Sequence, residues 1–242
     1  MPLAALLLAG CSYAADTSGQ SQCRDGAAKI KQTAMPEHRA LKEAPMKPTL
    51  PSILEAELDA IRKDPGEAIG FGEKAYLPYE PNVGNGLMNS DDIKVTERLL
   101  AEARGNGSRV YRLAVLHLLG KRVDATVDAA LMALLNDPDL CATSAYLLGR
   151  SGFKGYPKRV RDASTVAAAL HQHLSDETKF NDPFYRRTFR TQDFVLAAFV
   201  RVSGPEQFRI DNPDLADMIG YGLPSFTDEL RADLLKQALH ID

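Results

Sequence analysis

The chain has no tryptophan, and aromatic residues make up only 7% of its 242 residues. Aromatic side chains are the usual rigid platforms for stacking sugars and flat ligands, so the composition gives little support to a carbohydrate-binding protein. Excess charge is also small, because 29 basic and 32 acidic residues leave a formal net charge of −3. No global positive field therefore points to a nucleic acid partner.

Cysteine is scarce, with three residues in the whole chain: Cys11, Cys23 and Cys141. This spacing fits no metal site, and no cofactor motif accompanies it. Two states of Cys141 fit the sequence. It could bond to Cys23 in an oxidising compartment, or it could be a free thiol that packs as a small buried hydrophobe.

Groupings of catalytic or metal-binding residues are not found either. His171 and His173 form the closest histidine pair, but residues two apart on a helix point in nearly opposite directions and cannot share a metal. Ser151 and Lys154 match a Ser-x-x-Lys pattern, yet glycine follows the serine where a helix should begin. No catalytic residue and no metal site is predicted.

The most informative motif lies near the N-terminus. Leu3 to Gly10 is an apolar run that is too short to span a bilayer, which needs about twenty residues, but it fits the core of a secretory signal. The sequence Leu8-Ala9-Gly10-Cys11 resembles the lipobox of bacterial lipoproteins. That resemblance implies a signal peptide over 1–10 and lipid on Cys11. Ser12 after the cysteine implies the outer membrane, facing the periplasm.

Two other interpretations of this segment remain open, namely a signal without lipidation and an apolar N-terminal helix of the fold. Signals normally open with positive charge, whereas the first Lys or Arg here is Arg24. Residues 11–49 are rich in Ala, Ser, Gly, Gln, Lys and Pro. Such a composition cannot bury enough surface to offset its ordering entropy, so we expect a flexible tether.

Residues 50–242 are predicted to be an all-helical domain. Apolar residues recur there at helical spacing, and no convincing alternating strand is found. Capping residues and breakers predict helices over 52–63, 91–104, 108–119, 124–135, 137–148, 163–174, 194–203 and 225–239, the last with a capping box formed by Ser225 and Asp228. The helix over 108–119 is apolar on all sides and should be buried on all sides. Residues 66–88 are expected to be a long loop.

Several of these helices end in similar sequences. Leu118-Leu119-Gly120-Lys121 is echoed by Leu147-Leu148-Gly149-Arg150, and more loosely by residues 199–204. The segment Ala129 to Gly152 resembles a HEAT-like repeat, and spacings of roughly thirty to fifty residues suit that family. The resemblance implies helical hairpins stacked as a short α-solenoid. The alternative is a generic irregular helical bundle.

Basic residues gather in two places and form the candidate binding site. The first cluster is Arg150, Lys154, Lys158, Arg159 and Arg161, and the second is Arg186, Arg187 and Arg190. In a solenoid the ends of successive hairpins stack along one edge, where both clusters could meet and bind an acidic partner. The alternative is ordinary solvated loop charge.

The sequence therefore predicts a lipid-anchored, non-catalytic protein-binding module. A sharper version is an immunity protein against a secreted toxin, and another is a scaffold for an envelope complex. The alternative from a different class is a hydrolase of unrecognised type that uses the loop over 66–88. Neither the oligomeric state nor the identity of the partner protein follows from the sequence, since fold alone does not assign function.

The anchor can be tested by replacing its cysteine. We expect Cys11→Ala to release the protein from membranes, because one missing thioether removes the acyl chains that hold it there. Fractionation of cells into membrane and soluble periplasmic material measures this. A Cys11→Ala protein that still sediments with membranes would contradict the lipid assignment.

Overall fold

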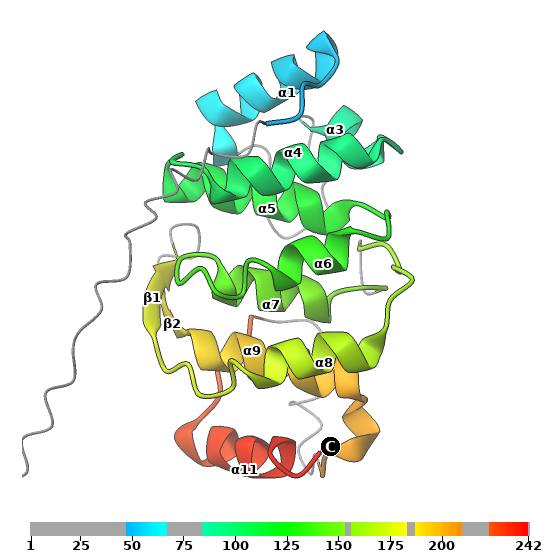
Figure 1. Ribbon diagram of the computed structural model, residues 1–242. Helices are drawn as coiled ribbons and strands as arrows, with labels where there is room; N and C mark the ends of the chain where they lie inside the picture. The colour runs from blue at the N-terminus through cyan, green and yellow to red at the C-terminus, as the bar shows by residue number, and fades with distance from the viewer. Residues whose placement is uncertain (1–46, 67–83, 153–155, 183–186, 210–222, 242) are drawn as a thin grey trace, which may run out of the picture. The chain divides into compact units, whose positions relative to one another are not determined.

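The chain is organised as pairs of neighbouring helices, which Figure 1 shows one above the other. The computed structural model describes residues 47–66, 84–152, 156–182, 187–209 and 223–241. Their elements, in chain order, are α1 (Ser52–Lys63), α3 (Asn85–Asn89), α4 (Ile93–Arg104), α5 (Arg109–Lys121), α6 (Val127–Met132), α7 (Cys141–Gly149), α8 (Ala163–His171), β1 (Lys179–Asp182), β2 (Arg187–Arg190), α9 (Thr191–Ser203), the 3-10 helix η1 (Pro205–Gln207) and α11 (Asp228–Ala238). The expectation of a mainly helical fold is confirmed.

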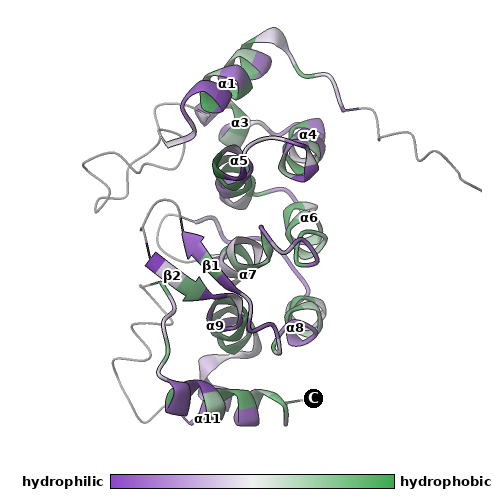
Figure 2. Cartoon of the chain, turned by 90° about the vertical axis from the view of Figure 1, so that its left-hand side faces the viewer, coloured by the Kyte–Doolittle hydropathy of each residue, from purple (hydrophilic) through white to green (hydrophobic). Residues whose placement is uncertain are grey.

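The central helices form two rows that face each other across the core. Helices α5, α7 and α9 make one row and α4, α6 and α8 the other (Figure 2). Each helix packs against its partner in the pair and against the next helix in its row. Helix α5 is buried along most of its length, as its apolar sequence predicts, because α1, α3, α4, α6 and α7 all contact it.

Two glycines set the spacing within the row of α5, α7 and α9. A Cβ added at Gly120 would lie 2.7 Å from the side chain of Leu147 in α7, and one added at Gly149 would lie 3.0 Å from the backbone of Ala198 in α9. Both glycines lie at the C-terminal ends of their helices. Only a residue without a side chain allows so close an approach, and the three helices therefore run parallel and in contact.

Most helix boundaries agree with the prediction. The N-terminal caps of α5, α4 and α11 show where it is confirmed and where it is wrong. Ser108 caps α5 as predicted, since its Oγ accepts the N–H of Tyr111 at 3.2 Å. The cap of α4 is Asp92, whose side chain accepts the N–H of Lys94, so this helix begins two residues later than predicted. The predicted capping box at Ser225 is wrong, because Thr227 caps α11 instead.

Two helices start later than predicted because an aspartate forms a turn before them. Asp124 accepts the N–H of Thr126 at 3.1 Å, and α6 begins only after Thr126. Asp137 accepts the N–H of Asp139 at 2.9 Å, and α7 begins after Leu140. Side chains of this type compete with the helix for backbone donors, so the same residues that signal a helix start also delay it.

The predicted loop over 66–88 ends in a short helix, α3. Gly84 precedes it in the left-handed region with a φ of 94°. The carboxylate of Glu57 in α1 accepts the N–H groups of Gly86 at 3.0 Å and Leu87 at 2.9 Å. This cap comes from another helix, so no local pattern could reveal it.

The expectation that no strand is present is wrong. β1 and β2 form a two-stranded antiparallel sheet in which Phe180 pairs with Phe189. Both rings contact Phe194 of α9 at centroid distances of 5.5 Å. Each strand has only four residues. A segment of that length is too short to show a recognisable alternation of apolar and polar residues. The aromatic contacts hold the hairpin against the start of α9.

Buried arginines join one helix pair to the next. Arg159, which is 4% exposed, donates to the carbonyl oxygens of Gly120 at 2.9 Å and Leu147 at 3.0 Å, and to the carboxylate of Asp128 at 2.7 Å. These carbonyls belong to the last turns of α5 and α7, where few intrahelical donors remain, although the Leu147 carbonyl also accepts the N–H of Arg150 at 3.1 Å. One guanidinium thus donates to carbonyls at the ends of α5 and α7 and also pairs with Asp128 of α6.

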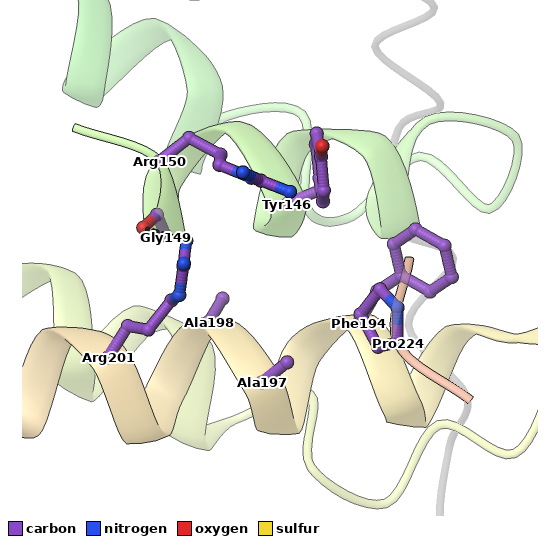
Figure 3. Close-up of a pocket in the computed structure, with 8 residues that line it drawn as sticks. All are labelled: Tyr146, Gly149, Arg150, Phe194, Ala197, Ala198, Arg201 and Pro224. Carbon is purple, nitrogen blue, oxygen red and sulfur yellow. Dashed lines mark hydrogen bonds between the residues drawn. The ribbon is translucent and has the colours of Figure 1, made fainter. Parts of the chain in front are cut away.

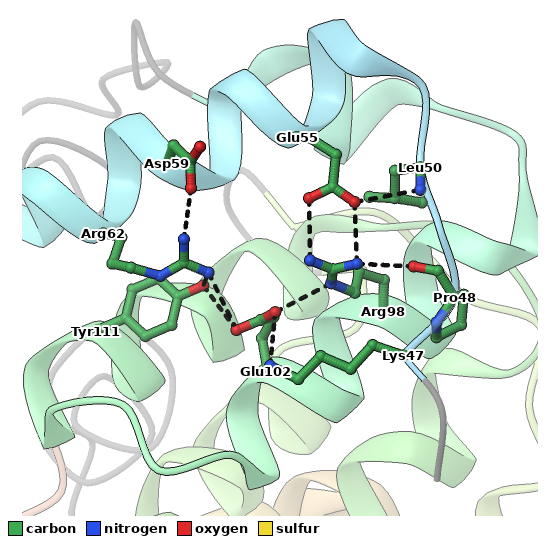
Figure 4. A network of polar contacts seen from close by, with 9 residues as sticks. All are labelled: Lys47, Pro48, Leu50, Glu55, Asp59, Arg62, Arg98, Glu102 and Tyr111. Atoms are coloured by element: carbon green, nitrogen blue, oxygen red, sulfur yellow. Dashed lines mark hydrogen bonds and ion pairs between the residues drawn. The ribbon is translucent and has the colours of Figure 1, made fainter.

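The N-terminal end of the described chain is held by a second polar network (Figure 4). The buried carboxylate of Glu102 accepts hydrogen bonds from Lys47 at 2.9 Å, Arg98 at 3.0 Å, Tyr111 at 3.1 Å and Arg62 at 3.4 Å. Burial raises the pKa of Glu102, but the bonds from Lys47, Tyr111 and Arg98 outweigh it and hold the pKa below its usual value.

This network also shows that the folded part begins earlier in the chain than predicted. The tether was expected to extend through Thr49, yet Lys47 already pairs with Glu102, and Arg98 donates to the carbonyl of Pro48 at 2.8 Å. Residues 1–46, including Cys11 and Cys23, lie outside the described residues. Cys141 is a buried free thiol, and burial raises its pKa to about 12. None of the described helices is long and apolar enough to cross a bilayer.

Removal of the Arg159 side chain tests how much the arginine bridge stabilises the fold. We expect Arg159→Met to lower the free energy of unfolding by about 3–5 kcal/mol, because it removes the closest ion-pair partner of the buried Asp128 carboxylate and the arginine donor to two carbonyls. Urea denaturation measures the change. The matched control is Lys158→Met at the exposed neighbouring residue, which should shift stability by less than about 0.5 kcal/mol. Equal effects of the two substitutions would contradict the bridging role.

Candidate protein-binding surface at the helix ends

The helices of one row, α5, α7 and α9, each carry a cation at the C-terminal end. Lys121 is the last residue of α5, Arg150 follows α7, and Arg201 lies in the last turn of α9. Cations suit this position because the helix dipole places partial negative charge there. Since the helices run parallel, the three positive side chains gather at one side of the row.

Two tyrosines complete this group, which we name the cation–tyrosine cluster: Lys121, Tyr146, Arg150, Tyr156 and Arg201. The Lys121 Nζ lies 4.3 Å from the ring centroid of Tyr156, and the Arg150 Cζ lies 4.5 Å from that of Tyr146. Cation–π contacts of this kind hold a cation in place without neutralising it. Arg150 is buried and the other four are partly exposed.

Repulsion within the cluster shows in the pKa values of its cations. Burial lowers the pKa of Lys121, and the nearby charge of Arg150 lowers it further. Burial and Arg150 likewise lower the pKa of Arg201 to about 10. Arg201 with this pKa remains protonated at neutral pH, and the cluster gathers three basic side chains in one place.

A small cavity lies between α7 and α9 inside this cluster (Figure 3). Arg150 extends along α7 toward Tyr146, while Arg201 rises from α9 and donates to the carbonyl of Gly149 at 3.0 Å. The enclosed volume is about 10 Å³, room for about one water molecule. The arrangement therefore suits contact with an anionic group at its rim rather than enclosure of a substrate.

A second, open hollow lies at the other ends of the helices. Arg104, Arg112 and Asn136 line it together with Asp137 and Asp139. Arg112 pairs with both aspartates and also donates to the carbonyl of Ala103 at 2.6 Å. These contacts tie α5 to the turn before α7, so the hollow is explained by the packing of the helix pairs.

The first basic cluster predicted from the sequence is divided by the structure. Arg159 is engaged in the buried bridge, and Arg161 donates to the carbonyl of Leu148 at 2.5 Å. Arg150 belongs to the cation–tyrosine cluster, and Lys158 is exposed. Lys154 lies outside the described residues. Arg159 is therefore removed from the candidate surface, because a buried and fully bonded guanidinium cannot contact a partner.

The described residues of the second basic cluster do not meet those of the first, which corrects the expectation of one shared edge. Arg187 and Arg190 lie in β2, whose Phe189 packs on Ala142 at the start of α7, whereas Arg150 follows the end of that helix. Arg187 is exposed, and Arg190 pairs with Asp228 at 3.3 Å. Arg186 lies outside the described residues.

The local charge runs of the sequence did not predict four members of the cation–tyrosine cluster, namely Lys121, Arg201, Tyr146 and Tyr156. A signal for two of them was present, since Gly120-Lys121 and Gly149-Arg150 are the echoed helix endings and Arg201 lies in the looser third copy. Equivalent positions in stacked hairpins lie above one another. Tyr156 had no such signal, because it is placed by the connection between α7 and α8.

Other predicted features have plain structural roles. Ser151 Oγ accepts the backbone N–H of Arg159 at 2.9 Å. The described part of the segment proposed for a hydrolase, Gly84–Met88, packs on α1 and α5. Within the described ranges no group of three or more His, Cys, Asp or Glu could hold a metal ion. Comparisons with protein-family models, curated proteins and solved structures found no match to this chain.

His117 of α5 lies one turn before Lys121 and gives the protein a testable pH response. Burial and the charge of Lys121 lower its pKa to about 4. The unfolded chain binds this proton at about pH 6.5, so stability should fall as the pH decreases through the range between these values. We expect a loss of about 1–2 kcal/mol between pH 7 and pH 5.

Urea denaturation at the two pH values measures this loss, with His117→Asn as the comparison. The variant should show a flatter response, since it has no proton to take up. Glu102, whose pKa is lowered, loses its contribution only below its usual value of about 4.3, which lies outside the measured range. The same pH response in both proteins would show that His117 is not the titrating group.

Proposed function

We propose that the chain is a non-catalytic protein-binding module whose helix pairs form a short HEAT-like α-solenoid. The echoed helix endings support this interpretation, because their glycines have the same role in successive pairs. Gly120 contacts α7 and Gly149 contacts α9. Each glycine carbonyl also accepts a hydrogen bond from an arginine that comes later in the chain, Arg159 and Arg201 respectively.

The observation that carries the proposed binding role is the cation–tyrosine cluster. It lies at the ends of three stacked helices and concentrates positive charge at equivalent positions along the row. Stacked helical arrays use such extended surfaces to bind partners. Complementary charge speeds association and selects the partner, so the proposed partner is a protein with an acidic surface.

For the location, we propose a lipid on Cys11 that holds the protein at the periplasmic face of the bacterial outer membrane. The lipobox resemblance and the tether composition support this. In that place a small non-catalytic module suits an immunity protein that blocks a secreted toxin. The second candidate is a scaffold of an envelope complex. A toxin gene beside the chain's own gene would favour the first role, and an operon of envelope machinery the second.

Co-purification tests the binding role directly. Full-length protein, tagged at the C-terminus and purified from detergent-solubilised membranes, should bring down one dominant protein in a comparable amount. We expect Lys121→Gln to lower its yield at least threefold, while Lys94→Gln, at an exposed residue of α4, leaves it unchanged. Thermal unfolding of both variants controls for folding. Absence of any partner, even after chemical cross-linking in cells, would contradict a binding function.

A further inference from the structure

Two large apolar side chains are exposed on helix connections, one between α5 and α6 and the other between α7 and α8. Val123 follows α5 and is 61% exposed, and Val160 precedes α8 and is 93% exposed. Each comes directly after a buried arginine, Arg122 or Arg159. A single exposed valine is ordinary on a protein surface. Here the same pair of residues, a buried arginine followed by an exposed valine, occurs on both connections.

The arginines fix the backbone that presents these valines. Arg122 donates to the carbonyl of Asp92 at 3.1 Å and to the hydroxyl of Thr96 at 2.7 Å. Arg159 is held by its bonds to α5, α6 and α7, and its own N–H is bound by Ser151. A contact made by a backbone that is already ordered costs little entropy on binding.

The end of α5, where the first connection begins, contacts the second connection. Arg159 bonds to Gly120, just before the first connection, and Lys121 lies over the ring of Tyr156 in the second. Figure 1 draws both connections on its right-hand side, so their exposed side chains lie on one side of the folded part. We name this surface the valine edge: Lys121, Val123, Tyr156, Lys158 and Val160.

The positive charge of the valine edge comes from Lys121 and Lys158, and the nearby carboxylates are engaged in hydrogen bonds and ion pairs of their own. Asp124 accepts bonds from Thr96, Thr126 and Arg122. Asp128 is buried against Arg159. Asp162 caps α8. Lys158, by contrast, is exposed and forms no ion pair with another described residue.

We propose that the valine edge binds an acidic segment of the partner protein, in which apolar side chains contact Val123 and Val160 while carboxylates lie against Lys121 and Lys158. This inference rests on the proposed protein-binding function and adds where the partner docks and what it must present. Apolar contact on a rigid backbone supplies affinity, and the flanking lysines select for negative charge.

Site-specific photo-cross-linking in the native cells tests the proposal. The probe is p-benzoylphenylalanine placed in the full chain at Val123, at Val160 or, as the control, at Ile53, which is 71% exposed in α1. We expect one protein to be captured from both valine positions and not from Ile53. Mass spectrometry of the cross-linked peptide should locate an acidic segment that contains apolar residues.

A charge reversal gives the second measurement. Lys158→Glu should reduce capture at Val123 at least threefold, while Lys63→Glu, at an exposed lysine at the C-terminal end of α1, leaves it unchanged. Capture of a segment without carboxylates, capture of a second copy of this chain, or an unchanged yield in Lys158→Glu would overturn the proposal. Capture only at Ile53 would overturn the valine edge but keep the binding function, whereas no capture at any position would count against both.

Discussion

The hydrogen bonds of buried arginine side chains to helix-end carbonyls are the interactions on which this fold depends most. Every helix leaves carbonyl groups unsatisfied in its last turn, and here parallel helices bring several such ends together. Arg159 donates hydrogen bonds to carbonyls at the ends of α5 and α7, and Arg201 donates to the last carbonyl of α7. At the C-terminal end, Arg231 pairs with Asp193 of α9 at 2.5 Å and donates to the carbonyl of Phe226.

These bridges also explain why apparent surface charge was misleading. A run such as Arg159-Val160-Arg161 predicts a solvated basic loop, because charged residues are rarely buried without partners. In the structure the arginines turn inward and the valine between them turns outward. The planar guanidinium can reach carbonyls on two helices and a carboxylate at once, an arrangement that depends on tertiary neighbours and leaves no local signature.

The parts of the fold that were predicted correctly are those set by local chemistry. Apolar periodicity located the main helices, and Ser108 was recognised as a cap because its role involves only the next few residues. The parts that were missed depend on distant contacts. Glu57 caps α3 from another helix, and the aromatic contacts with Phe194 hold the short hairpin. The candidate site shows the same division, since the echoed Gly120-Lys121 and Gly149-Arg150 pairs were visible whereas Tyr156 was not.

The segment at Lys47 and Pro48 has a mechanical consequence. Any pull on the chain that precedes it enters the folded part through the Lys47–Glu102 ion pair and the bond from Arg98 to Pro48. Arg98 is itself paired with Glu55 of α1, and Glu102 is shared with Arg62 and Tyr111. A force on the chain before Lys47 is therefore shared among α1, α4 and α5 before it reaches the helix pairs that follow.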